Sequence, residues 1–414
     1  MHLHLATQLR LAARRAAVPG ASRRPPASRR SCVASVTARA TTSSTLDARR
    51  STLTLTLPRV AHLLSATPPT SVAVGGHRGL GQNPLPQPAR AGDIAAPPPH
   101  RENTVASLLA AAAAGASFVE VDAQVTADGV AVLWHDDAVV VAGPRGPVAL
   151  PVSGLTLAQF QALNRNASGA LAPPALSSSD SEGWATDGHR LLRPVAGVAA
   201  AVVARRRRRA APGGTAPWAV AADDALPTLA EALAALPPGL GINVEVKGAS
   251  LAAYDPAARA AGGRAARAET ARVVAGVLAG LEEGGRRAGA RPVLFSSFDV
   301  RLAGALRDGQ GDWPVFLLSE EASPSTGLTA ARLGLQGVVV DAAALLAGEA
   351  LSQPPSICPA AVAALTRPPG GTRLRLATYG AVNDIPAVVA ALVAEGVEAV
   401  IVDDVGGVLG GLKK

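Results

Sequence analysis

The sequence predicts an α/β fold, a parallel (β/α)8 TIM barrel that carries a small hairpin and an insertion. Two observations support this prediction. Eight short apolar segments of β type recur from residue 71 onward, and segments with helical spacing follow most of them. Alternation of this kind favours a parallel sheet, and eight units favour its closure into a barrel. The active site of such a barrel lies at the carboxyl ends of its strands.

The eight strands are expected at residues 72–76, 117–122, 241–247, 292–296, 314–318, 336–340, 373–378 and 398–402. Helices are expected at residues 103–115, 265–284, 300–307, 328–333, 359–366 and 384–395. A ninth apolar run, residues 130–134, follows the turn sequence Ala127-Asp128-Gly129. This run predicts a hairpin arm that returns antiparallel to the second strand.

Composition and charge exclude several classes of function. Of the 414 residues, 48% are hydrophobic, which is enough for the core of one large domain. The formal charge is +8, but residues 1–70 hold 11 arginines and a single acidic residue, Asp47. The rest of the chain is therefore close to neutral, and no nucleic-acid partner is expected. The apolar runs are too short to span a bilayer, so no transmembrane segment is expected either.

The repeating pattern predicts the barrel over residues 71–410. Two segments do not follow this pattern. Residues 1–70 are rich in Arg, Ser, Thr and Ala, as is typical of an organelle transit peptide. A chloroplast is the expected destination, with a mitochondrion or a merely disordered leader as alternatives. Residues 165–225 include the arginine run 205–209 and predict an inserted low-complexity loop. A basic run can also contact anionic lipid, but a solvated loop is favoured.

Acidic residues gather on two of the predicted strands. Residues two apart on a strand face the same side, so Glu120 and Asp122 are expected together, and Glu245 faces the same way on the third strand. Like charges this close are costly unless a cation lies between them. Oxygen ligands favour a hard ion, Mg²⁺ or Ca²⁺. The alternative is a barrel interior of salt-bridged layers without a metal.

Histidines and basic residues are expected at the same end of the barrel. His77 ends the first strand, and the hairpin returns His135 to the level of Asp122. Two histidines beside the carboxylates suggest a general acid and a general base. Arg78 and Lys247 supply positive charge for oxygens, and the glycines around His77 allow close approach of the backbone. The expected ligand is a small anion, a phosphate.

Six ordered motifs resemble those of the glycerophosphodiester phosphodiesterases. They are His77-Arg78-Gly79, Glu102-Asn103-Thr104, Val119-Glu120-Val121-Asp122, Thr126-Ala127-Asp128-Gly129, His135-Asp136 and Asn243-Val244-Glu245-Val246-Lys247. The resemblance covers residues 72 to about 404. Gly79, Gly81 and Asn83 make the first motif similar to that of the eukaryotic members.

The resemblance implies a barrel that hydrolyses a small glycerophosphodiester to sn-glycerol 3-phosphate and an alcohol such as choline, ethanolamine or glycerol. By the same resemblance, Glu120, Asp122 and Glu245 would bind a divalent metal, Mg²⁺ or Ca²⁺. His77 and His135 would act as general base and acid, although the sequence does not assign which is which. The implied activity is that of EC 3.1.4.46.

The resemblance also implies a substrate-binding set. Arg78 and Lys247 would hold the phosphate. Glu102 would orient Arg78 or support the metal ligands. Asn103 would cap the following helix and contact the phosphate.

Two other functions stay open at the level of the sequence. A phospholipase D-like or C-like hydrolase could use a similar site on a lysophospholipid or a phosphoinositide. Such an enzyme needs a membrane-facing rim, for which the insertion with residues 205–209 is the visible candidate. A barrel that has lost its activity and serves as a binding protein is disfavoured, because every expected ligand and both histidines are present.

Overall fold

The computed structural model describes most of the chain from residue 72 onward. The described residues are 72–83, 98–136, 138–143, 146–163, 191–194, 215–217, 220, 224–248, 263–288, 291–347 and 355–413. The expected transit peptide, residues 1–70, and the arginine run, residues 205–209, lie outside these ranges. No helix in the described ranges is long and apolar enough to cross a membrane.

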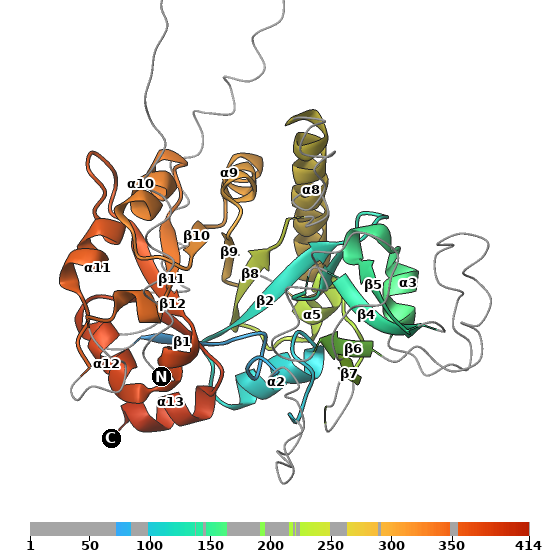
Figure 1. The fold of residues 1–414 in the computed structure, drawn as a ribbon, viewed down its shortest axis with the longest axis horizontal. Coiled ribbons are helices and arrows are strands. Elements are labelled where there is room, and N and C mark those ends of the chain that lie inside the picture. Colours follow the sequence, from blue (N-terminus) through green and yellow to red (C-terminus); the bar gives the residue numbers. More distant parts are fainter. Residues whose placement is uncertain are drawn as a thin grey trace, which may run out of the picture. The chain divides into compact units, whose positions relative to one another are not determined.

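Eight parallel strands form a closed barrel, as the sequence predicts (Figure 1). The strands are β1 (Ala73–Gly76), β2 (Phe118–Val125), β8 (Gly241–Val246), β9 (Val293–Ser297), β10 (Val315–Ser319), β11 (Gly337–Asp341), β12 (Arg375–Tyr379) and β13 (Ala399–Val402). Their order around the barrel is β1-β13-β12-β11-β10-β9-β8-β2, and β1 also pairs with β2. This last pairing closes the barrel. All eight predicted strands are confirmed, with ends shifted by a few residues.

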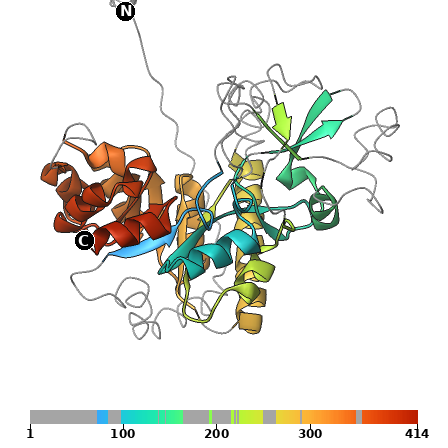
Figure 2. The same cartoon turned by 90° about the horizontal axis from the view of Figure 1, so that it is seen from below.

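Helices cover the outside of the barrel (Figure 2). They are α2 (Val105–Ala113), α5 (Leu229–Ala235), α8 (Gly263–Ala288), α9 (Val300–Gly309), α10 (Pro324–Arg332), α11 (Pro359–Thr366), α12 (Pro386–Ala394) and α13 (Val405–Leu412). The six predicted helices are confirmed. The prediction missed α5 and α13. Helix α5 begins with a capping box in which the Thr228 hydroxyl accepts from the Glu231 backbone and the Glu231 carboxylate accepts from that of Thr228.

Strand alternation sorts side chains into two layers. Outward residues such as Val119 and Val121 join the core between sheet and helices. Inward apolar residues from most of the strands, among them Phe118, Phe316 and Ile401, fill the lower part of the barrel. Above this apolar floor the inward side chains of β2 and β8 are polar, and three of them are carboxylates. The floor thus closes the barrel from below and leaves its carboxyl-terminal end for the site.

A hairpin extends β2, as predicted. Strand β3 (Ala131–Leu133) pairs antiparallel with β2, Ala123 opposite Leu133. Strands β4 (Ala138–Gly143) and β5 (Gly146–Pro151) follow, and then α3 (Leu157–Ala162), none of which the sequence analysis predicted. In both views this part lies on the flank away from α10 to α13 (Figures 1 and 2).

The segment 165–225, expected to be an inserted loop, contains two described strands. Strands β6 (Leu191–Pro194) and β7 (Thr215–Pro217) join β4 and β5 in a four-stranded antiparallel sheet. Leu191 packs with Val139, Val141 and Trp134 in a satellite core. The loop prediction is therefore corrected for these two pieces, where a few apolar residues within a biased composition suffice to pair with a neighbouring hairpin.

Barrel closure depends on a glycine. Gly75 faces inward on β1 opposite Phe118, and a Cβ at residue 75 would overlap the Phe118 ring, which is 3% exposed. We therefore expect Gly75→Ala to lower the free energy of unfolding by about 1 to 3 kcal/mol, because the ring or the strand must shift. Urea unfolding of the variant and the wild type would measure the difference in the free energy of unfolding.

The matched control for this variant is Gly154→Ala, where a Cβ would have open space around it. Its free energy of unfolding should stay within about 0.5 kcal/mol of the wild type. Equal stability of the two variants would contradict the role assigned to Gly75.

Candidate active site

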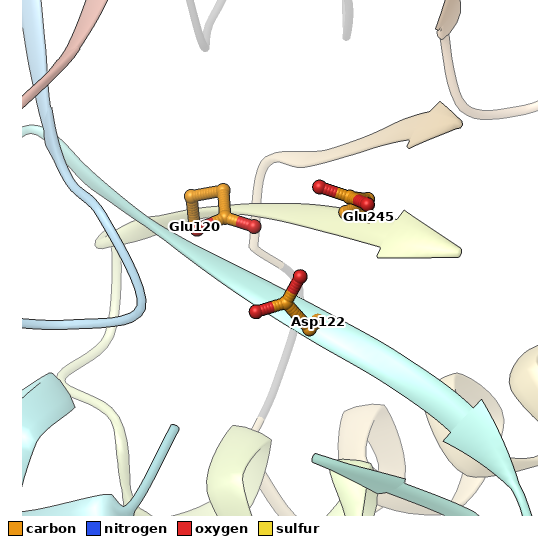
Figure 3. A group of neighbouring side chains, drawn as sticks. All are labelled: Glu120, Asp122 and Glu245. Atoms are coloured by element: carbon orange, nitrogen blue, oxygen red, sulfur yellow. The ribbon is translucent and has the colours of Figure 1, made fainter. Parts of the chain in front are cut away.

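Three carboxylates meet at the carboxyl-terminal end of the barrel. Glu120 and Asp122 extend inward from β2, and the parallel register places Glu245 of β8 beside Asp122. One oxygen from each carboxylate lies within 4.8 Å of the other two, and Figure 3 shows the three groups turned toward one another. Glu120 is 3% exposed and Asp122 is 1% exposed. The grouping expected from the sequence is therefore present.

This group has the chemistry of a site for a hard divalent cation. Its donors are all oxygens, and the Glu120 Oε1 atom is buried with no hydrogen-bond partner. Burial, Asp122 and Glu245 together raise the pKa of Glu120 well above its usual range. A cation bound among the three oxygens would satisfy the Oε1 atom and remove the repulsion, so the residues fit the Mg²⁺ or Ca²⁺ that the sequence predicts.

Asp122 is ionised in spite of its burial. Burial favours the neutral acid, but Lys247, His135 and Arg78 outweigh it and hold the pKa of Asp122 well below its usual range. The Lys247 Nζ atom lies 3.1 Å from Asp122 Oδ1 and 2.7 Å from Glu245 Oε1. Burial alone would lower the pKa of Lys247, yet these carboxylates raise it. Lys247 is therefore a charged ammonium at the mouth.

Arg78 contacts three acidic residues at once. Its backbone N–H donates to Glu120 Oε2 at 2.9 Å, and its Nη1 donates to Glu102 Oε1 at 2.8 Å. Its Nε lies 3.3 Å from Asp122 Oδ2. The pairing of Arg78 with Glu102 agrees with the orienting role expected for Glu102. Burial alone would lower the pKa of the Arg78 guanidinium, but the three carboxylates raise it overall.

Asn103 has a different role from the expected helix cap. The cap of α2 is Thr104, whose hydroxyl accepts from the Ser107 backbone N–H, so the prediction for Asn103 was wrong on this point. Asn103 instead donates its side-chain N–H to Asp122 Oδ2 at 2.8 Å and accepts from the Asp122 backbone N–H at 3.1 Å. Its own backbone N–H donates to the Arg78 carbonyl at 2.9 Å. Asn103 therefore fixes the position of Asp122.

The loop after β1 is packed tightly against its neighbours. Gly79 and Gly81 have φ of 95° and 90°, which glycine adopts at little cost. A Cβ at Gly79 would overlap Ser107, and one at Gly81 would overlap the Asp403 backbone. These contacts hold the loop between α2 and the end of β13, and so fix His77 and Arg78.

His77 has a partner that the sequence analysis did not assign. Its Nδ1 lies 2.8 Å from Asp403 Oδ1, at the end of β13. The Asp403 carboxylate also accepts the Gln82 backbone N–H at 2.8 Å. Burial would raise the pKa of Asp403, but His77 and Gln82 lower it overall. Asp403 lies two residues after Ile401, which faces the barrel interior. This spacing predicts that Asp403 faces the site and could have identified it in the sequence.

His135 is held from two sides. Its Nδ1 lies 2.9 Å from Asp136 Oδ1, so the carboxylate that follows it orients the ring. The buried Gln124 side chain donates to the carbonyls of Trp134 at 2.8 Å and Asp136 at 2.7 Å. Gln124 faces the same side of β2 as Asp122, which is the pattern that could have identified it. His135 is one of the groups that lower the pKa of Asp122, so the ring lies near the carboxylates.

A small pocket adjoins the carboxylates on the side of the hairpin. It is lined by Glu102, Asn103, Trp134, His135 and Asp136. All the residues predicted for the site therefore gather at one end of the barrel, on β1, β2, β8 and the loops that follow them.

The contacts of Asn103 lead to a stability prediction. Asn103→Ala removes both hydrogen bonds to the buried Asp122 and places alanine at φ 58°, so we expect a loss of about 2 to 4 kcal/mol in the free energy of unfolding. Asn103→Gly removes the same bonds without the backbone strain and should lose about 1 kcal/mol less. Thermal or urea unfolding would measure both, and wild-type stability in either variant would contradict the role given to the amide.

Comparison with known proteins agrees with this geometry. The sequence profile of the glycerophosphoryl diester phosphodiesterase family matches residues 77–407. Glycerophosphodiester phosphodiesterase GDPD2 of Arabidopsis thaliana is 27% identical over 343 residues, 80% of this chain and 75% of that protein. The chloroplastic GDPD1 of the same plant is 25% identical over 345 residues, 80% of this chain and 78% of that protein.

Among solved structures, a phosphodiesterase of Oleispira antarctica in complex with its product sn-glycerol 3-phosphate is similar at 16% identity. The match covers 85% of this chain and 99% of that one, with a TM-score of 0.49. The family profile spans well over half of the sequence and includes every residue of the site described above. The chain belongs to the glycerophosphoryl diester phosphodiesterase family, enzymes of phosphodiester hydrolysis (EC 3.1.4.46).

Proposed function

We propose that this enzyme hydrolyses small glycerophosphodiesters to sn-glycerol 3-phosphate and an alcohol, with a divalent metal at the three carboxylates and two histidines as general acid and base. The observation that carries the proposal is the group Glu120, Asp122 and Glu245, with oxygens within 4.8 Å of one another. Two of its buried oxygens, Glu120 Oε1 and Asp122 Oδ1, have no hydrogen-bond partner among the described residues. Membership of the family supports the reaction class.

Glu120, Asp122 and Glu245 would hold the metal, either Mg²⁺ or Ca²⁺. Bound there, it would supply charge that stabilises the phosphate oxygens and favours ionisation of a hydroxyl. Arg78 and Lys247 keep their positive charge beside the same carboxylates and attract the phosphate of the substrate.

The histidines move protons on either side of the phosphorus. Asp403 orients His77 and Asp136 orients His135, each through Nδ1, which leaves Nε2 of each ring for the reaction. One ring takes the proton of the attacking hydroxyl and the other gives a proton to the leaving alcohol. The attacking group is either water or the neighbouring glycerol hydroxyl, and in the second case water then opens a cyclic phosphate.

The lipid-hydrolysing alternative depends on residues 205–209, which lie outside the described part of the chain, and no described feature favours it.

We further propose import into a chloroplast, supported by the composition of residues 1–70 and by the name of one relative. A fluorescent protein fused after residue 70 should enter chloroplasts, and its presence in mitochondria alone would overturn that destination.

The metal site leads to a prediction on binding. Calorimetry should find one Mg²⁺ or Ca²⁺ bound per chain, and Glu245→Gln should weaken the affinity at least about tenfold, because it removes a charged ligand. The exposed Glu395 at the end of α12 offers the control Glu395→Gln, which should bind as the wild type does. Chelation should abolish release of glycerol 3-phosphate, and activity that survives thorough chelation would rule out the metal.

The histidine roles lead to a prediction on rate. His77→Ala and His135→Ala should each lower kcat by roughly 10² to 10⁴, the usual contribution of a general acid or base. The affinity for the product, glycerol 3-phosphate, should change by less than about threefold, because neither ring supplies the charge that holds the phosphate. Full activity of either variant would exclude that histidine, and lost product binding would point to a structural role instead.

A further inference from the structure

Asp403, which orients His77, lies just beyond the end of its own strand. Its carboxylate binds the Nδ1 atom of His77 at 2.8 Å, whereas strand β13 ends at Val402. On the side of β12, pairing within the sheet ends earlier still, with Thr378 opposite Val400. The sheet alone therefore does not fix the backbone of Asp403 on that side.

A 3₁₀ turn, Ala381–Asp384, follows β12 and takes its place at this level. The half-buried Asp384 ends the turn, and its Oδ1 atom accepts the backbone N–H of Asp403 at 2.8 Å and that of Asp404 at 2.9 Å. Backbone N–H groups that lose their strand partner need another acceptor. One carboxylate oxygen thus supplies the hydrogen bond that a longer β12 would supply to Asp403.

The turn is fixed to β13 at a second point. The Asn383 side chain donates to the Ile401 carbonyl at 3.0 Å and accepts the Thr378 hydroxyl at 3.2 Å. Both Asn383 and Thr378 are buried, and the Asn383 backbone N–H donates to the Gly380 carbonyl at 3.0 Å. A buried network of this kind restricts the turn. The position of the Asp384 oxygen is therefore set by the fold.

Asp403 is consequently held from two sides. On the side of β1, the His77 backbone N–H donates to the Val402 carbonyl at 2.9 Å, and the Gln82 backbone N–H donates to Asp403 Oδ1 at 2.8 Å. On the other side, Asp384 holds the backbone N–H of Asp403. A hydrogen bond weakens steeply when its geometry is lost, so the bond to His77 depends on both supports.

The segment requires the acceptor atom of Asp384 rather than its charge. Burial raises the pKa of Asp384, and so do the negative charges of Asp403 and Asp404, against the effect of the two N–H bonds. Burial and like charge thus oppose an ionised carboxylate at this place, and the two hydrogen bonds favour it. A side-chain amide offers the same carbonyl oxygen without the charge.

We propose that Asp384 is a positioning residue for the reaction: through the backbone of Asp403, it holds the carboxylate that orients His77. The inference rests on the proposed function, because it takes His77 as a general acid or base. Asp384 has no contact with the substrate in this arrangement. His135, which Asp136 orients on the hairpin, does not depend on it. Loss of Asp384 should therefore impair proton transfer by one histidine and leave binding of the phosphate intact.

The first test compares two substitutions of Asp384 with glycerophosphocholine and glycerophosphoglycerol as substrates. Asp384→Ala removes the acceptor and should lower kcat about 3- to 30-fold, part of the contribution of a general acid or base. KM should change by less than about twofold, because Arg78 and Lys247 hold the phosphate. Asp384→Asn keeps a carbonyl oxygen and should stay within about twofold of the wild-type kcat. Should Asp384→Ala not fold, Asp384→Ser takes its place with the same expectations.

A double-mutant cycle with His77→Ala separates positioning from a general structural effect. Measured against the residual activity of His77→Ala, the addition of Asp384→Ala should lower kcat by less than about twofold, because the ring that it positions is absent. An effect that acts elsewhere in the barrel would lower the residual activity by the full factor.

The matched control is Asp404→Ala, in the same segment. The exposed Asp404 carboxylate also accepts a backbone N–H, that of Gly407 at 2.8 Å, but it caps α13 and adjoins Asp403 in sequence, so it faces the other way. Asp404→Ala should lower the free energy of unfolding in urea and leave kcat within about twofold of the wild type.

Several outcomes would overturn the positioning role and leave the proposed function standing. These are a wild-type kcat in Asp384→Ala, the same loss with and without His77, an equal loss in Asp384→Asn, or an equal loss in Asp404→Ala. A wild type that hydrolyses neither substrate with Mg²⁺ or Ca²⁺ would overturn the proposed function, and this inference with it.

Discussion

Mutual repulsion among Glu120, Asp122 and Glu245 is the constraint on which the rest of the site depends. Two of these carboxylates are nearly inaccessible to water, and the register of β2 and β8 prevents them from separating. A buried charge without a partner is costly, so each acid must be protonated, hydrogen-bonded or paired with a cation. The structure uses a different solution for each of them.

Asp122 is compensated mainly by cations of the protein, although its Oδ1 atom has no hydrogen bond among the described residues, whereas Glu120 is compensated less. Lys247, Arg78 and the Asn103 amide all face Asp122, and Lys247 also neutralises Glu245. Glu120 receives a single backbone hydrogen bond and retains one buried oxygen without a partner. Burial and the repulsion within the cluster therefore act most strongly on Glu120, whose pKa they raise. A divalent ion held by Glu120, Asp122 and Glu245 would supply the missing positive charge, as the all-oxygen donor set also indicates.

Much of this arrangement was predictable from local pattern. Period-two alternation places Glu120 with Asp122 and Glu245 with Lys247 on the inner face. The carboxyl ends of parallel strands always lie together, so the group of three carboxylates could be predicted from spacing. The strands that form the barrel were predictable because each holds a short apolar run or an alternation of apolar and polar residues. The hairpin arm followed from its turn sequence, and His135 was placed near Asp122 by counting along it.

Features that depend on contacts between distant segments were not predictable in the same way. Asp403 pairs with His77 across 326 positions of sequence. Alternation along β13 places Asp403 on the inner face, but it does not identify His77 as its partner. Asn103 looks like a helix cap, since asparagine is common there, but its left-handed backbone turns the amide toward Asp122 and leaves the cap to Thr104. Strands β6 and β7 are short and lie in a biased composition, so only the pairing of β6 with β4 and of β7 with β6 makes them strands.

The same alternation that builds the carboxylate cluster also decides which charges line the mouth. Each strand of a closed barrel directs every second residue inward, and the chemistry around the rim therefore follows the order of the strands. Here Arg78 follows β1 and Lys247 follows β8, so both cations lie on the same side of the mouth as the three carboxylates. The carboxylates hold these cations in place, and the cations keep Asp122 ionised. An anion that enters the mouth therefore meets its charge complement beside β1 and β8.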